Sequence, residues 1–145
     1  MNYLVFLDPH AGELEKILSG VKSMVLKEFD PLHQAAHPVE TGDSLYFLRD
    51  NHEYSLRVKA TVVRVLPLTS STEEGLSHAL KEQQPRLQLT EAQYNTWAVK
   101  KQAQLVEFTS AHKIDVIQVA AHKVSDRAGW IAFEQFSLIT EKHEQ

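Results

Sequence analysis

Residues 8–29 read DPHAGELEKILSGVKSMVLKEF and combine a helix, its stop signal and the strand that follows. Asp8 belongs to the residue types that cap free helical amides, and Pro9 suits the first helical position. Gly20 supplies the left-handed conformation in which many helices end. Between these signals one helical face is apolar and carries Leu14, Ile17 and Leu18. The pattern therefore predicts a helix that stops at Gly20.

Lys22 follows this stop signal directly, so we expect it at a defined place beside the helix end. The strand predicted over residues 22–29 has no cleanly apolar side, which suits a strand whose polar side lines a cleft. We therefore predict that this corner forms one wall of a binding cleft. The alternative is a solvated lysine whose charge complements the end of the helix dipole.

The composition is that of a single globular domain. The chain has 145 residues, of which 43% are hydrophobic and 23% are charged. We expect one domain over residues 1–140 and a frayed tail over residues 141–145. The absence of cysteine excludes disulfides, thiolate zinc sites and cysteine nucleophiles. The formal net charge of -4 argues against non-specific wrapping of nucleic acid, so any such contact must be local.

The N-terminal segment MNYLVFLDP holds an apolar run of only five residues and no basic segment. We therefore expect neither a signal peptide nor a membrane span, and a cytoplasmic protein.

Short strands dominate the rest of the chain. Apolar or alternating runs predict strands at residues 3–7, 44–48, 54–66, 105–108, 114–119 and 130–139. The first run is wholly apolar and should be buried on both faces. A turn joins the second and third of these strands, which should pair as an antiparallel hairpin.

Two capping boxes predict two helices after the hairpin. The first helix begins at Ser70 or Ser71 and ends at Pro85, and the second begins at Thr90 and runs to about Lys101. This excursion, residues 69–101, is either a lid over the cleft or a packing buttress. Helices segregated from short strands are typical of the α+β class. We predict a small mixed β-barrel with flanking helices, because closure removes the edges of short strands.

The helix-to-strand segment resembles the ASCH domain (activating signal cointegrator homology) of the PUA-like superfamily. The family motif has the form G-x-K-x-x-E-x-R, which Gly20 and Lys22 match. Val25 stands where the motif has glutamate, and Lys27 where it has arginine. A loop that ends in TGD before a strand, followed by a basic, valine-rich strand, also fits the family. The resemblance implies a PUA-like barrel with a cleft that binds RNA or nucleotide-like ligands.

We therefore predict that RNA or a modified nucleoside binds between the barrel and the first helix. The residues expected to bind it are Gly20, Lys22, Ser23, Lys27, Arg57 and Lys59. The basic side chains would neutralise phosphate, and an aromatic ring would stack on a base. Arg57 and Lys59 share one face of their strand, which is either part of this site or a solvated face of the sheet. The candidate stacking residues are Tyr94, Trp97 and Trp130, for which packing is the competing explanation.

Two other functions remain open from the sequence. Some proteins that share the pattern are amidohydrolases acting on N4-acetylcytidine, and others are ribonucleases, which makes Lys22 a candidate catalytic residue. Ser23 or a glutamate, such as Glu73, Glu74 or Glu82, would complete the set. Val25 occupies the position of the amidohydrolase threonine, which argues against an enzyme. The other possibility is a protein-interaction adaptor.

We expect no cofactor and no metal ion. His33 and His37 have the spacing of two ligands on one helical face, but no third ligand has matching spacing. The sequence leaves the oligomeric state and the identity of the ligand open.

Overall fold

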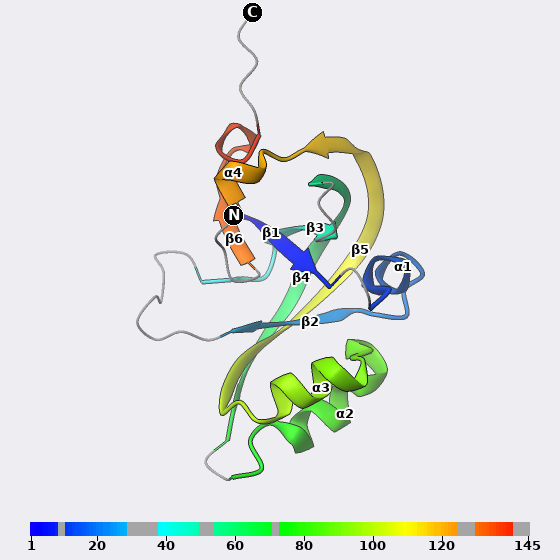
Figure 1. Ribbon diagram of the computed structural model, residues 1–145, viewed down its shortest axis with the longest axis vertical. Coiled ribbons are helices and arrows are strands. Elements are labelled where there is room, and N and C mark those ends of the chain that lie inside the picture. Colours follow the sequence, from blue (N-terminus) through cyan, green and yellow to red (C-terminus); the bar gives the residue numbers. More distant parts are fainter. Residues whose placement is uncertain (9–10, 29–37, 50–53, 71–72, 125–129, 141–145) are drawn as a thin grey trace, which may run out of the picture.

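The computed structural model describes residues 1–8, 11–28, 38–49, 54–70, 73–124 and 130–140. These residues form a mixed six-stranded sheet with the order β2-β5-β4-β3-β1-β6. The strands are β1 (Asn2–Leu7), β2 (Met24–Glu28), β3 (Ser44–Arg49), β4 (Ser55–Thr69), β5 (Gln102–Gln118) and β6 (Trp130–Phe133). Within the described residues β1 and β3 run parallel, and the other strand pairs are antiparallel. The long strands β4 and β5 curl together, so the sheet forms half of a barrel (Figure 1).

Helices flank this sheet. The described part of the chain contains α1 (Glu13–Leu18), α2 (Ser77–Leu87), α3 (Glu91–Ala98) and α4 (Ala121–Val124). The helices α2 and α3 lie together beneath β2, whereas α1 lies beside β5 (Figure 1). This arrangement confirms the predicted α+β class, with helices flanking a small mixed sheet that curls into half of a barrel.

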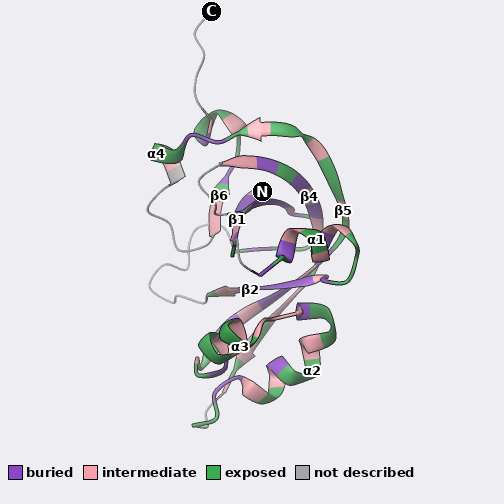
Figure 2. Ribbon diagram, turned by 45° about the vertical axis from the view of Figure 1, so that its right-hand side comes forward, coloured by how far each residue is buried: buried purple, intermediate pink, exposed green. Residues whose placement is uncertain are grey.

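The strand β1 is buried from both sides, as its wholly apolar sequence predicts. Tyr3 and Val5 pack in the main core inside the curl of the sheet, where Ile17 of α1 joins them. Leu4 points to the opposite face and packs with Phe133. Figure 2 shows buried residues along the strands and a more exposed surface on the helices. Burial of each large apolar side chain contributes about 1.5–3 kcal/mol to the stability of the fold. The apolar side chains that β1 sends alternately to its two buried faces are therefore a major source of that stability.

The strand β2 is also covered on both sides. Met24 and Leu26 pack against Leu80 and Leu87 of α2, whereas Val25 joins the main core. The helices α2 and α3 therefore act as a buttress of the sheet. The hydrogen bond from the Tyr94 hydroxyl to the Ser77 carbonyl, at 3.3 Å, ties the two helices together.

Several local predictions are confirmed. The strands β3 and β4 form the expected antiparallel hairpin, and along β4 the exposed or half-buried Arg57 and Lys59 alternate with buried apolar residues. Thr90 and Gln93 form the expected capping box, with hydrogen bonds of 3.2 and 3.0 Å. Gly20 adopts a φ of 85° directly after α1, as the stop signal predicts.

The predicted starts of two helices were wrong. The helix α1 begins at Glu13 and its N-cap residue is Gly12, so Asp8 does not cap the helix. Instead, the Asp8 backbone N–H donates to Oε2 of Glu13 at 3.0 Å. The helix α2 begins at Ser77 instead of following Ser70 or Ser71. A tertiary contact replaces the expected capping box, because the Leu76 N–H donates to the Ala98 carbonyl of α3 at 2.9 Å.

The predicted ends of both helices in the excursion were also wrong. Pro85 lies inside α2, which continues to Leu87 and stops where Gln88 turns left-handed. The helix α3 ends at Ala98 and does not reach Lys101.

The last strands also differ from the prediction. β5 is one strand of 17 residues, where the sequence suggested two, at residues 105–108 and 114–119. Register shifts against β4 and a positive φ of 59° at Ser110 let the polar middle of β5 stay paired while the sheet curls. β6 stops at Phe133, and a 3₁₀ turn at Phe136–Leu138 replaces the rest of the predicted strand. The turn predicted between the second and third strands, at residues 50–53, and the tail at 141–145 lie outside the described residues.

Candidate functional site

A pocket of about 470 Å³ lies between β1, β2 and α3, with further residues from α1 and β6. Its size falls in the range of about 300–1,000 Å³ that is typical of small-molecule sites. Its aromatic lining consists of Phe6, Trp97 and Trp130. Its polar lining consists of Asp8, Glu13, Lys22, Glu28, Gln93 and Thr96. The pocket therefore combines flat apolar surfaces with groups that form hydrogen bonds.

Lys22 is the most deeply buried charged residue of this pocket, with a relative exposure of 1%. Its Nζ lies 3.5 Å from Oε1 of Glu13 and donates to the Leu87 carbonyl at the end of α2. A helix C-terminus carries partial negative charge, so both partners stabilise the ammonium. Lys22 thus joins α1 to α2 across one wall of the pocket.

The acid–base properties of Lys22 follow from this environment. Burial lowers the pKa of Lys22 from its ordinary value of 10.5, and the Glu13 carboxylate opposes that effect. A buried charge is costly without partners. The ion pair with Glu13 and the bond to Leu87 therefore explain how the chain accommodates Lys22 in the charged form.

Backbone hydrogen bonds hold the segment around Lys22 in place, and some of them join it to residues far away in the sequence. The Lys22 N–H donates to the Lys16 carbonyl at 3.0 Å, which closes the end of α1. The Ser23 N–H donates to the Arg86 carbonyl at 2.9 Å, and the Ser23 carbonyl accepts the Phe108 N–H at 3.0 Å. Gly20 and Ser23 thus position the segment but do not line the pocket.

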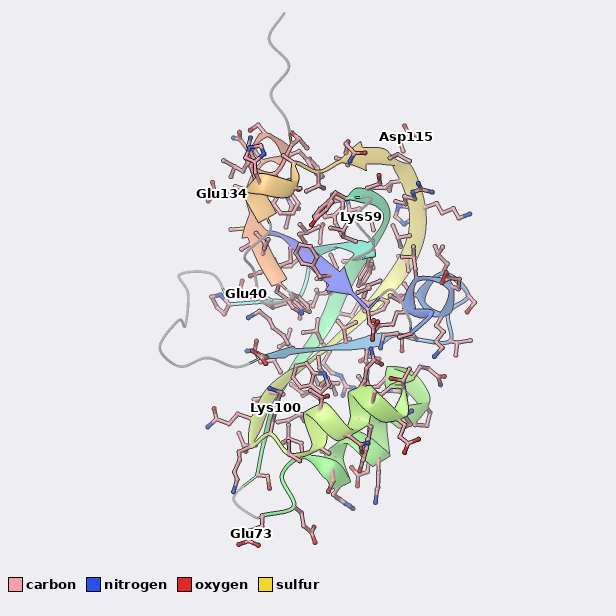
Figure 3. All side chains as sticks on the ribbon, in the orientation of Figure 1. Glu40, Lys59, Glu73, Lys100, Asp115 and Glu134 are labelled. Carbon is pink, nitrogen blue, oxygen red and sulfur yellow. The ribbon has the colours of Figure 1, made fainter. Side chains whose placement is uncertain are left out.

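The other predicted basic residues do not join Lys22. Lys27 lies outside the lining of this pocket, although burial lowers its pKa against the opposing effect of Glu28. Arg57 lines a second pocket of about 400 Å³, which α1 forms with β4 and β5. Lys59 lies over the ring of Tyr46, 5.6 Å from its centroid. Figure 3 shows Lys59 far from the α3 end of the molecule, where Lys100 lies.

Sequence reasoning overlooked the carboxylates of the pocket. Asp8 was assigned to helix capping, and Glu13 and Glu28 were assigned no role in the site. Trp97 and Trp130 were recognised as possible stacking residues, but packing was preferred. Both indole rings line the pocket. No signal in the sequence brings Trp97 and Trp130 together with Lys22, because only the fold places the three side chains around one pocket.

The described residues contain no group of three or more histidine or acidic side chains placed to hold a metal ion. His33 and His37 lie outside the described residues. Every helix in the described ranges is too short or too polar to cross a bilayer.

The fold is similar to that of solved ASCH proteins from Zymomonas mobilis. The ASCH protein from that organism has a TM-score of 0.65 at 11% identity, over 92% of this chain and 88% of that chain. The chain has the ASCH fold. A tyrosine-to-phenylalanine variant of the same protein gives a TM-score of 0.66 at 12% identity, over 92% and 91% of the two chains. A serine-to-alanine variant gives 0.66 at 11% identity, over 92% and 89%.

The resemblance seen in the segment around Gly20 and Lys22 is therefore confirmed at the level of the ASCH fold. No protein-family model matches the sequence, and no curated protein matches it.

Proposed function

We propose that the pocket beside Lys22 binds a nucleoside, either free or as an unpaired residue of an RNA chain. The observation that supports this proposal is the pairing of two indole rings, Trp97 and Trp130, with polar side chains in a pocket of about 470 Å³. A nucleoside has a flat base that stacks on aromatic rings and polar edges that form hydrogen bonds. The ASCH fold agrees with such a ligand, because the resemblance to that family implies a cleft for RNA or nucleotide-like ligands.

The charges of the pocket favour recognition of the base over recognition of phosphate. Three carboxylates line the pocket, on Asp8, Glu13 and Glu28, and Glu13 and Glu28 are paired with Lys22 and Lys100. The basic residues Arg57, which is exposed, and Lys59, which is half-buried, lie elsewhere on the protein. We therefore expect nucleoside affinity to depend little on the salt concentration. An affinity that depended on phosphate contacts would fall steadily as the salt concentration rises.

A hydrolase is a second candidate because of the chemistry of Lys22. A lysine whose pKa is lowered by burial, beside a carboxylate in a pocket, is typical of general-base sites. Val25 lines the same pocket with an apolar side chain, so it offers no nucleophilic oxygen. Binding therefore ranks before catalysis.

The experiment is a thermal-shift titration with cytidine, N4-acetylcytidine and a short single-stranded RNA. The test variant is Ala92→Phe, because Ala92 is exposed on α3 and lines the pocket, so a phenyl ring there fills the site. The matched control is Asn95→Phe, which adds the same ring to an exposed position of α3 outside the lining.

We expect a thermal shift in the wild type and in Asn95→Phe, and none in Ala92→Phe. The same shift in all three proteins would place binding outside the pocket, and no shift with any nucleoside would refute the proposal. Chromatography of the same samples tests hydrolysis. Conversion of N4-acetylcytidine to cytidine that is lost in Lys22→Met would favour the second candidate.

A further inference from the structure

We propose that the pocket recognises its base through the backbone of β2, with the Leu26 N–H as donor and the Leu26 carbonyl as acceptor. The ligand class is then a nucleobase that carries a hydrogen-bond donor directly beside an acceptor. The inference rests on the proposed nucleoside function and specifies how the base is bound.

The strand β2 has a free edge. It is the first strand in the order β2-β5-β4-β3-β1-β6, so among the described residues it pairs with β5 alone. In an antiparallel ladder, hydrogen-bonded and non-hydrogen-bonded residue pairs alternate. The Phe108 N–H donates to the Ser23 carbonyl at 3.0 Å, which places the next hydrogen-bonded pair at Val25 and Val106. The Leu26 N–H and carbonyl therefore point away from β5, toward the free edge.

The pocket lies along this edge. Successive residues of a strand alternate between its two faces, and here Val25 packs in the main core, whereas Leu26 packs with α2. A pocket that both residues line reaches the edge between the two faces. Val5 and Phe6 of β1 line it in the same way, because Val5 packs in the main core and Phe6 on the opposite side. The pocket therefore occupies the opening between β2 and β1, which are not neighbours in the half-barrel (Figure 1).

The two backbone groups of Leu26 are suited to a base. Leu26 is 8% exposed, and no residue of the described ranges forms a hydrogen bond to it across the free edge. Buried backbone N–H and C=O groups are almost always paired. In an extended strand both groups of one residue point to the same side, which is why opposite residues of antiparallel strands exchange two hydrogen bonds. A base with a donor beside an acceptor can form the same two bonds.

A base fits this edge better than a peptide strand does. Addition of a strand needs main-chain hydrogen bonds along several residues. Of the β2 residues whose backbone groups face the free edge, Leu26 and Glu28 line the pocket, whereas Met24 does not. The pocket is also bounded by α3 and has a volume of about 470 Å³, which suits a compact planar group.

The experiment compares neutral isomers that differ in one donor. 5-Methyluridine carries N3–H between two carbonyl groups, whereas 3-methyluridine has a methyl group in place of that hydrogen. 2-Methylinosine, which keeps N1–H beside a carbonyl, and 1-methylinosine, which lacks it, form a matched pair of purines. Isothermal titration of the full chain should show at least about tenfold tighter binding of the isomer that keeps the donor, because the other isomer leaves the Leu26 carbonyl unpaired.

Amide hydrogen exchange in the wild type, followed by NMR, tests the position of the base. With each nucleoside that binds, cytidine included, exchange of the Leu26 N–H should slow at least about tenfold relative to that of the Met24 N–H. The Met24 N–H is the control, because it faces the same edge outside the pocket lining.

Leu26→Pro is the test variant, because proline has no N–H and its ring lies where the base would pair. Leu26 is opposite Leu105 in a non-hydrogen-bonded pair, so the substitution removes no hydrogen bond to β5. Leu26→Ala is the matched control, since it also removes the leucine side chain but keeps the N–H. We expect the preference between isomers to fall at least about threefold in Leu26→Pro and to stay unchanged in Leu26→Ala.

Equal affinities within the isomer pairs, or tighter binding of the isomer without the donor, would overturn recognition by β2 and leave the nucleoside proposal intact. No slowing at Leu26 with a bound nucleoside, or an unchanged preference in a folded Leu26→Pro protein, would do the same. If Leu26→Pro does not fold, hydrogen exchange in the wild type decides. Displacement of the nucleoside by a short peptide of alternating valine and threonine would overturn the inference in favour of strand addition. If neither these isomers nor cytidine bind, the proposed function fails together with this inference.

Discussion

Replacing Lys22 with methionine should destabilise the protein strongly, although methionine is similar in length and apolar. The substitution removes the partner of the Glu13 carboxylate, whose side chain is 9% exposed, and the donor of the Leu87 carbonyl. Breaking one side of a buried ion pair costs about 3–5 kcal/mol. Glu13 keeps its bond to the Asp8 N–H, so we expect the lower end, about 3 kcal/mol. Since small domains have about 5–15 kcal/mol of stability, the variant should still fold.

Urea unfolding followed by tryptophan fluorescence measures this loss. The double variant Lys22→Met, Glu13→Gln removes the charge left behind but keeps an acceptor for the Asp8 amide. It should therefore be about 1–2 kcal/mol more stable than Lys22→Met alone. Lys100→Met is the control, because its ion pair with Glu28 is partly exposed and contributes less than about 1 kcal/mol. Wild-type stability in Lys22→Met, or an equal loss in Lys100→Met, would refute the stabilising role of the buried Lys22 ion pair.

The same variants test the lowered pKa of Lys22. The folded state releases this proton at a lower pH than the unfolded state, whose lysine has the ordinary value of 10.5. In the window below pH 10.5 the unfolded state binds more protons, so the free energy of unfolding rises with pH. We expect wild-type stability to rise relative to Lys22→Met as pH approaches 10.5. Comparison with the variant also cancels the contribution of Lys27, and a constant difference would contradict the shift.

Three further predictions use other parts of the structure. Burial and nearby carboxylates raise the pKa of Tyr3 from 10.0 to about 12, so stability present below pH 10.0 is lost between pH 10.0 and about 12. Tyr3→Phe should flatten that alkaline loss in urea titrations. Gly75→Ala should lower Tm more than Gly12→Ala, because both have φ near +60° but only at Gly75 would a Cβ lie 2.2 Å from an α3 carbonyl. Arg57→Gln and Lys59→Gln should leave nucleoside affinity unchanged in titrations, because neither residue lines the pocket beside Lys22.

The fold was predictable where a signal is contained in a few neighbouring residues. The apolar run of β1, the hairpin of β3 and β4, the capping box at Thr90 and the stop at Gly20 all have this property. The start of α2 was not predictable, because the hydrogen bond from Leu76 to Ala98 replaces a local cap. The continuity of β5 depends on pairing with β4, so its polar middle was misread as a break.

The site was predictable only in part, because the basic residues of the sequence are not neighbours in space. The sequence correctly predicted that Lys22 lies beside the end of the helix. It predicted an accessible residue in the wall of a cleft, whereas Lys22 is buried. Leu87, whose carbonyl accepts the hydrogen bond of the Lys22 ammonium, is 65 positions away in the chain. Arg57 lines the pocket that α1 forms with β4 and β5. Lys59 lies over the Tyr46 ring, away from α3 in Figure 3.

The excursion of residues 69–101 is the reason why the site and the stability of the fold are connected. Within it α2 supplies the Leu87 carbonyl that accepts from Lys22, and α3 supplies Trp97 to the pocket. The same two helices bury Met24 and Leu26 of β2. A ligand that contacts Trp97 therefore contacts an element whose packing also fixes β2 and Lys22. It follows that nucleoside binding should stabilise the whole domain against unfolding, by an amount that grows with the ratio of ligand concentration to Kd.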